Sequence, residues 1–599
     1  MARAKPAERP QAALGRLPEW DLRDLYPSPD SPELARDLDG AERAAKAFRE
    51  AWAGRLAAAS GGDLARAIAD YERIDETLAR ASSYAQLLHA KDVANPEIGK
   101  FYQSVQERTN SIASELLFFT LELNRLEEAE LQTKLADAKL GRYRPWLRDI
   151  RVFRDHQLKE EMERLLHEKQ VAGRSAWTRL YDETMAALRF PLGKQALTIA
   201  EILNRLSSKN ARTRRQAAES LGRVLEENLR LFSLITNTLA KDKEIEDRWR
   251  HYPNPMAQRN KVNQVEDAVV AALIEAVKDA YAPLSHRYYR IKAKWFGKDQ
   301  LDYWDRNAPL PEDADRLVPW AEAETTVLAA YRRFSPRLAE IGQRFFQGDW
   351  IDAPAKPGKA SGAFAHPTVP SAHPYLLLNY QGRTRDVMTL AHELGHGVHQ
   401  VLAAKQGHLM ADTPLTLAET ASVFGEMLTF RALLEAEKKP KRRRVLIAGK
   451  VEDMLNTVVR QVALHEFEFR VHGERPKGEL TPERLSEIWL DVQQESLGPA
   501  IRFDHSYRSY WAYIPHFVHT PFYVYAYAFG DCLVNSLYAV YQDAEQGFAE
   551  RYLDMLAAGG THRHQELLAP FGLNASDPAF WRRGLKVIET FVDELEAST

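Results

Sequence analysis

The chain has 599 residues, 28% of them charged, and its formal net charge is −3. So small a net charge gives no general attraction to nucleic acid or to an anionic membrane, and neither partner is expected. The one cysteine, Cys532, excludes an internal disulfide framework and fits a reducing compartment. The length exceeds what one hydrophobic core usually serves, which predicts two or more lobes.

The first ten residues carry basic side chains but lead into no apolar run, so we expect no secretory signal. Nowhere does an uninterrupted apolar stretch approach the ~20 residues that a membrane-spanning helix needs. Together with the single cysteine, these features predict a soluble protein in the cytoplasm.

Residues 31–189 are predicted to form a helical lobe. Segments rich in Ala, Leu, Glu and Arg, with glycine and proline at their ends, predict helices at 32–52, 62–88, 96–125 and 127–140. The pattern breaks at Phe190-Pro-Leu-Gly-Lys194 and resumes with a charged helix at 210–229. We therefore expect an N-terminal helical lobe at 1–190 and a second lobe at 191–599.

The stretch 361–382 departs from the helical pattern. Pro367, Pro370 and Pro374 forbid a helix there, and the apolar run Tyr375–Tyr380 predicts a strand. A small β-sheet should therefore lie beside the helix that follows. Its edge could pair with an extended peptide backbone, although a purely structural hairpin is the alternative.

The segment after this strand predicts a long amphipathic helix. Thr384 or Asp386 can cap its start, and Lys405 with Gly407 can end it. Apolar residues recur along it at spacings of three and four, which gives one apolar stripe. They are Val387, Leu390, Ala391, Leu394, Val398, Val401 and Leu402.

This helix carries the pattern H-E-x-x-H, at His392, Glu393 and His396. The two histidines lie one turn apart and about 40° from each other around the helix, close enough to share a metal ion. Glu393 lies about 100° further round, where its side chain can reach the open position of the metal as a general base. The pattern is typical of a zinc peptidase site, the alternative being a merely solvated histidine pair.

A catalytic zinc needs a third protein ligand and leaves its fourth position to water. The scheme H-E-x-x-H-x-x-G-x-x-H fails, because Leu402 stands at its last histidine and His399 at its glycine. Glu419 follows His396 by 23 residues on another predicted helix, enough for the chain to turn and return. We assign Glu419 as the third ligand.

Two further residues near the motif are given supporting roles. Glu426 follows Glu419 by seven residues and so lies on nearly the same helix face, where it could orient a ligand imidazole. His399 is interpreted as a helix-surface or supporting residue, because a fourth protein ligand would close the site.

Residues 505–530 hold far more aromatic side chains than the 10% of the whole chain. A helix can begin after Pro521, and on it Tyr523 and Tyr527 would share one face while Tyr525 points elsewhere. Peptide hydrolysis develops negative charge on the carbonyl oxygen, which Tyr hydroxyls or a His N–H can stabilise. His516, Tyr523 and Tyr527 are therefore catalytic candidates, against the alternative that they are ordinary core aromatics.

Motifs spread over nearly the whole chain resemble oligoendopeptidase F, of the thimet oligopeptidase family of zinc peptidases. They are Trp20-Asp-Leu-Arg-Asp-Leu-Tyr26, Leu378-Asn-Tyr-Gln-Gly through His396, Ala418-Glu-Thr-Ala-Ser-Val-Phe-Gly-Glu426, Ile514-Pro-His-Phe517, Pro521-Phe-Tyr-Val-Tyr-Ala-Tyr-Ala-Phe-Gly530, Ala557-Ala-Gly-Gly-Thr561 and Phe580-Trp581.

The resemblance implies a mainly α, two-lobed helical ellipsoid with one zinc per chain at the bottom of a deep central channel. Position by position, His392, His396 and Glu419 match the family's metal ligands, and Glu393 matches its general base. The match is weaker for the carbonyl-stabilising groups, whose spacing here differs from the thimet branch.

The expected function is therefore that of a zinc-dependent endopeptidase acting on short unstructured peptides through a metal-activated water. In this scheme Glu393 takes a proton from the water and delivers it to the leaving amine. Two alternatives stay open. One is a helical peptide-binding protein with a structural zinc or lost catalysis, against which the intact Glu393 argues. The other is a zinc carboxypeptidase of similar helical build.

Overall fold

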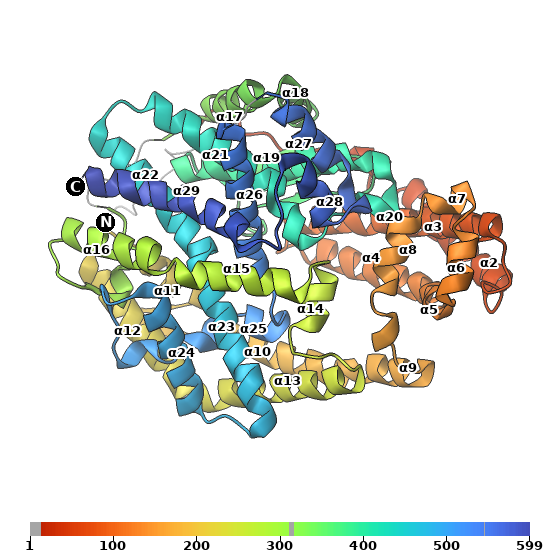
Figure 1. Ribbon diagram of the computed structural model, residues 1–599, viewed down its shortest axis with the longest axis horizontal. Helices are drawn as coiled ribbons and strands as arrows, with labels where there is room; N and C mark the ends of the chain where they lie inside the picture. Colours follow the sequence, from red (N-terminus) through yellow and green to blue (C-terminus); the bar gives the residue numbers. More distant parts are fainter. Residues whose placement is uncertain (1–13, 311–316, 544–545, 599) are drawn as a thin grey trace, which may run out of the picture. The chain divides into compact units, whose positions relative to one another are not determined.

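The computed structural model describes residues 14–310, 317–543 and 546–598, most of them in helices (Figure 1). The expected mainly helical class with small sheets is confirmed. Within the described ranges, no helix is both long and apolar enough to cross a membrane. The first ten residues, where no secretory signal was expected, lie outside the described part of the chain.

The chain forms two compact units, each assembled from three separate segments. The first comprises Met1–Arg154, Asp315–Ala436 and Ala544–Phe571, and the second Asp155–Ala314, Glu437–Asp543 and Gly572–Thr599. Both units take segments from either side of residue 190. The division into 1–190 and 191–599 therefore does not coincide with them and stays a prediction, as does the two-lobed ellipsoid with its channel.

The N-terminal helices of the first unit follow the sequence pattern closely. Helices α2 (Pro32–Trp52) and α3 (Gly61–Lys91) begin where Ser31 and Ser60 accept hydrogen bonds from backbone N–H groups of their first turns. Two of the expected helices are broken, however: that at 96–125 into α4 (Pro96–Ser114) and α5 (Leu117–Arg125), and that at 127–140 into α6 (Glu128–Lys134) and α7 (Ala138–Gly141). At the first of these breaks the backbone tightens to hydrogen bonds between residues three apart, which turns Leu116 into the core.

A three-stranded sheet lies in the first unit, as the prolines of 361–382 indicated. Strand β6 (Tyr375–Tyr380) is central, with β4 (Ile351–Pro354) parallel to it and β5 (Phe364–His366) antiparallel. No sequence pattern predicted β4, because its four residues include an aspartate and a proline. Both β5 and β6 pack against α19 (Thr384–Ala403), so the expected sheet beside the motif helix is confirmed.

Helix α19 has the ends that the sequence predicted. Asp386 accepts hydrogen bonds at its Oδ2 from the backbone N–H groups of Gln381 and Arg383, at 2.8 and 3.0 Å. Gly407 adopts a φ of 87°, which lets the chain turn away after a short 3₁₀ segment.

The packing of α19 against α21 (Leu415–Ala436) depends on Gly395. A Cβ atom on this residue would lie 2.5 Å from the carbonyl oxygen of Ala421 and 2.7 Å from Cα of Ser422. The same helix is held from a third direction by Tyr331 of α17 (Trp320–Phe334), whose hydroxyl donates to the Ala391 carbonyl at 2.6 Å. The backbones of α19 and α21 therefore approach closely at Gly395, within the H-E-x-x-H motif.

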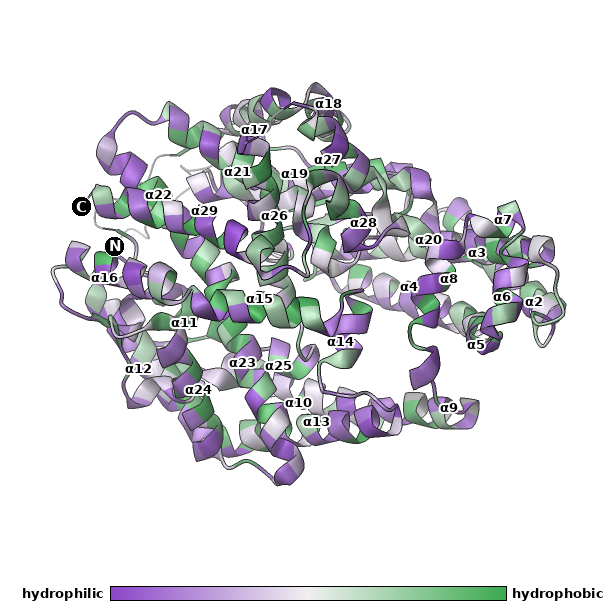
Figure 2. Cartoon of the chain, in the orientation of Figure 1, coloured by the Kyte–Doolittle hydropathy of each residue, from purple (hydrophilic) through white to green (hydrophobic). Residues whose placement is uncertain are grey.

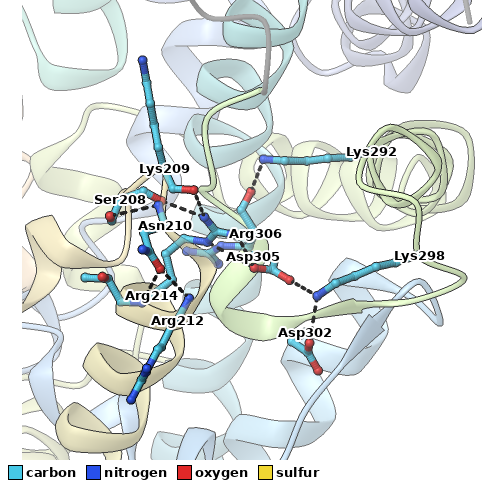
Figure 3. Close-up of polar contacts among 11 residues, drawn as sticks. Ser208, Lys209, Asn210, Arg212, Arg214, Lys292, Lys298, Asp302, Asp305 and Arg306 are labelled. Atoms are coloured by element: carbon cyan, nitrogen blue, oxygen red, sulfur yellow. Dashed lines mark hydrogen bonds and ion pairs between the residues drawn. The ribbon is translucent and has the colours of Figure 1, made fainter.

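The second unit is built mainly from amphipathic helices, and Figure 2 shows hydrophobic and hydrophilic residues mixed along most of them. Helix α26 (Tyr525–Asp543) is an exception, since it is buried over most of its length. In the same unit, a buried ion pair joins α12 (Ala211–Glu227) to the segment at 302–306: Arg214 Nη2 lies 2.7 Å from Asp305 Oδ1 (Figure 3).

We expect Gly395→Ala to destabilise the protein by about 1–3 kcal/mol, because α19 and α21 must separate to admit the methyl group. Zinc affinity should fall as well, since His396 and Glu419 would move apart. Thermal unfolding and zinc titration measure both effects. Gly40→Ala in α2 is the control, because no atom lies within 4 Å of the added Cβ. Equal stability of the Gly395→Ala protein and wild type would contradict the packing argument.

Candidate active site

Helices α19 and α21 bring the three predicted metal ligands together. Oε2 of Glu419 lies 3.3 Å from Nε2 of His392 and 3.5 Å from Nε2 of His396. One potential ligand atom from each residue falls within 4.8 Å of the others. Two imidazole nitrogens and one carboxylate oxygen match the donor set of a catalytic zinc site, which keeps its fourth position open. The residues therefore fit the expected metal.

Neighbouring polar side chains hold two of these ligands. Oε2 of Glu426 lies 3.2 Å from Nδ1 of His392, so an Nδ1–H would donate to it and leave Nε2 free for a metal. The Ser422 hydroxyl donates to Oε2 of Glu419 at 2.7 Å. The helical spacing predicted the role of Glu426. Ser422 was not predicted, although its position three residues after Glu419 is the corresponding signal.

His392 and Glu419 form a closely hydrogen-bonded pair, and each shifts the pKa of the other. Burial lowers the pKa of His392, but its hydrogen bonds to Glu419 and Glu426 outweigh this and raise it to about 10. Burial acts in the opposite direction on Glu419, yet hydrogen bonding to His392 and the nearby His396 lower the pKa of that carboxyl to about 2. A metal cation would replace the proton that this pair shares.

Glu393 differs from the ligands in its surroundings. Its side chain is buried, and burial raises its pKa to about 7, partly offset by the neighbouring His392. A backbone hydrogen bond from Ala365 of β5 also acts on the carboxylate. This contact ties the motif helix to the edge of the sheet, and no sequence signal predicted it.

His399 lies outside the group of potential ligands. It is buried, and its Nε2 lies 3.4 Å from the Thr413 hydroxyl. A cavity of about 670 Å³ extends from His396 along this part of α19 and is also lined by Gln400 and Asp412. The first unit therefore has a cavity that reaches one of the three potential metal ligands.

His516, Tyr523 and Tyr527 lie together in the second unit. The Tyr527 hydroxyl is 3.4 Å from Nε2 of His516, and the rings of Tyr523 and Tyr527 are 5.3 Å apart between centroids. All three are half-buried, whereas Tyr525 is fully buried and accepts a hydrogen bond from Asn263 at 2.9 Å. That Tyr525 points elsewhere is thus confirmed.

The prediction that Tyr523 and Tyr527 share a helix face is wrong. Helix α26 begins at Tyr525, after Phe522 has taken a φ of 59°, a left-handed conformation that interrupts any helical path. Tyr523 therefore precedes the helix and reaches Tyr527 from a turn. Their catalytic role stays a prediction.

We expect Glu419→Ala to lose zinc almost completely and Glu426→Gln to weaken zinc binding about 10–100-fold, because the first removes a ligand and the second only loosens His392. Titration with a competing chelator gives both affinities. Glu435→Ala, at the exposed end of α21, is the control. Unchanged zinc stoichiometry in Glu419→Ala would refute the ligand assignment.

Comparison with known proteins agrees with this geometry. The model of peptidase family M3 matches residues 205–587, and that of oligopeptidase F matches residues 122–190. Oligopeptidase PepF of Bacillus subtilis (strain 168) is 26% identical over 590 residues, which cover 96% of this chain and 86% of that protein. The chromosomal oligoendopeptidase F of Lactococcus lactis subsp. cremoris is 27% identical over 419 residues, 69% of each chain.

Two solved structures share the fold. One from Chlamydophila abortus superposes with a TM-score of 0.84 at 22% identity and covers 97% of this chain and 98% of its own. Oligoendopeptidase-F from Enterococcus faecium gives a TM-score of 0.70 at 23% identity, with 94% and 97% covered. Since the M3 model alone spans more than half of the sequence and includes every member of the metal-ligand group, this chain belongs to peptidase family M3.

Proposed function

We propose that this M3 peptidase is a zinc-dependent oligoendopeptidase that hydrolyses internal bonds of short, unstructured peptides. The observation that carries the proposal is the convergence of His392, His396 and Glu419, with Glu393 on the turn between the two histidines. Relatives named oligopeptidase and oligoendopeptidase F support the substrate class.

A zinc ion held by His392, His396 and Glu419, one per chain, would lower the pKa of a water to about 7 and polarise the scissile carbonyl. The chain's own contribution to the proton transfers is Glu393. Its carboxylate takes a proton from the attacking water and passes it to the leaving amine nitrogen, so the base is regenerated in each turnover. Glu426 keeps the imidazole of His392 in the orientation that zinc binding needs.

Two features of the first unit suit an extended peptide. Strand β5 is one of the two outer strands of its sheet, and the cavity beside His396 continues along α19. A peptide paired with the edge of β5 would be held through its backbone, so that many sequences could bind. We further propose that His516, Tyr523 and Tyr527 stabilise the negative charge on the carbonyl oxygen, and that the enzyme works in the cytoplasm, as its single buried cysteine suggests.

The test is hydrolysis of an internally quenched peptide of about ten residues that is blocked at both ends. Zinc-loaded wild type should cleave it internally. Glu393→Gln should keep its zinc but lose about 10²–10⁴-fold in kcat, because the proton acceptor is gone. Mass spectrometry locates the cut, and metal analysis of the same samples is the control.

Each other outcome points to a different function. Loss of single C-terminal residues from unblocked peptides, without cleavage of blocked ones, would show a carboxypeptidase. Tight peptide binding without hydrolysis, with zinc present, would show a binding protein. Near-normal turnover by Glu393→Gln would remove that residue from the mechanism.

A further inference from the structure

The turn before α26 holds a strained backbone next to the catalytic tyrosine candidates. Phe522 adopts a φ of 59°, a left-handed conformation that a residue with a side chain rarely takes. Its ring is fully buried, 5.0 Å from the ring of His472 between centroids. Backbone bonds then run from Tyr523 N–H to Thr520 O at 3.1 Å and from Tyr527 N–H to Val524 O at 3.3 Å. Phe522 therefore lies within the turn that leads into both tyrosines.

Two side chains of the second unit hold this turn. Oε1 of Glu468, on α23 (Val459–Glu474), accepts a hydrogen bond from the Phe522 N–H at 2.9 Å. From another element, Nε of Arg259 donates to the Pro521 carbonyl at 3.3 Å. The peptide unit that joins Pro521 to Phe522 is thus held at both of its polar groups, its N–H by an acceptor and its carbonyl by a donor.

Glu468 is an unusual residue to find in this place. It is 2% exposed, and its Oε2 has no hydrogen-bond partner among the described residues. Burial raises its pKa to about 8, against the smaller opposing effects of the Phe522 N–H, Arg259 and Lys243. Lys243 is itself paired with Asp247 at 2.8 Å.

The two histidines nearest to Glu468 on its own helix give it no charge to pair with. Burial lowers the pKa of His465 to about 4 and that of His472 to about 3, so both are neutral at physiological pH. Beside the carboxyl lies a cavity of about 10 Å³, lined also by His472 and Pro521 and large enough for roughly one water. A buried acid with one oxygen unused among the described residues costs stability, while its other oxygen accepts from the Phe522 N–H.

We propose that Glu468 is a positioning residue that holds Phe522 and thereby sets Tyr523 and Tyr527 for their action on the substrate carbonyl. The proposal rests on the function proposed above. It requires only that the side chain at this position accepts a hydrogen bond from the Phe522 N–H, so an amide in its place should serve as well as the acid.

Kinetics of four variants test this. Glu468→Ala should lower kcat about 10–100-fold, because a small misplacement of catalytic groups has effects of that size, with KM within about threefold. Glu468→Gln should keep most of the activity, since its amide oxygen accepts the same N–H. Glu466→Gln is the control: it lies on the same helix but pairs with Lys278 at 2.6 Å. Tyr527→Phe shows how much kcat falls when the hydroxyl itself is lost, and the fall in kcat for Glu468→Ala should be no larger.

A kcat for Glu468→Ala within twofold of wild type, an effect on KM alone, or equal losses in Glu468→Gln and Glu468→Ala would each overturn the proposal. Zinc content should match wild type in all variants, since the ligands lie in the other unit. If Glu468→Ala does not fold, Arg259→Gln tests the same turn, because it removes the guanidinium that donates to the Pro521 carbonyl.

Amide hydrogen exchange provides a measurement that does not depend on activity. Glu468→Ala should speed exchange in residues 519–527 but leave the segment of α19 at wild-type rates, and Glu468→Gln should change neither. Unchanged exchange at 519–527 in Glu468→Ala would contradict the positioning role even if no peptide were cleaved. Absence of cleavage by wild type, with the exchange result as expected, would instead count against the proposed function alone.

Discussion

The close approach of α19 and α21 is the constraint on which the metal site depends. Neither His392 nor His396 can bind a catalytic zinc alone, and their partner Glu419 arrives on a helix that must run almost in backbone contact with the motif. Gly395, in the middle of H-E-x-x-H, makes this possible, because any side chain would meet Ala421 and Ser422. The residue that contributes no atoms to the chemistry therefore decides whether the ligands meet.

Around this contact lie the carboxyl groups of Glu393, Glu419 and Glu426 and the imidazole of His392. Differences in their surroundings separate their roles. Glu419 and Glu426 are hydrogen-bonded to His392, which keeps the ligand carboxylate ionised and fixes the ring. Glu393 is buried, has a backbone hydrogen bond from Ala365 of β5, and stays outside the ligand group. A base and a ligand of the same chemical type are thus distinguished by burial and partners alone.

Much of the site could be predicted from sequence, because it depends on helical periodicity. The spacing of His392, Glu393 and His396 fixes their directions on one helix, and the same rule relates Glu419 to Glu426. The features that the sequence did not predict depend on tertiary contacts. The conformation of Phe522, which removes Tyr523 from the helix, is held by Glu468 from a helix more than fifty residues earlier in the chain. The interleaving of the two units likewise follows from packing between distant segments, which local sequence patterns do not predict.

The most direct test of this account is anomalous diffraction at the zinc edge from crystals of the zinc-loaded protein. The account predicts one strong peak per chain, about 2.0–2.2 Å from Nε2 of His392, Nε2 of His396 and an oxygen of Glu419. Glu393 and His399 should lie outside coordination distance. A peak at another position, or one with His399 or Glu426 among its ligands, would contradict the central claim that the α19–α21 contact builds an open, three-ligand site.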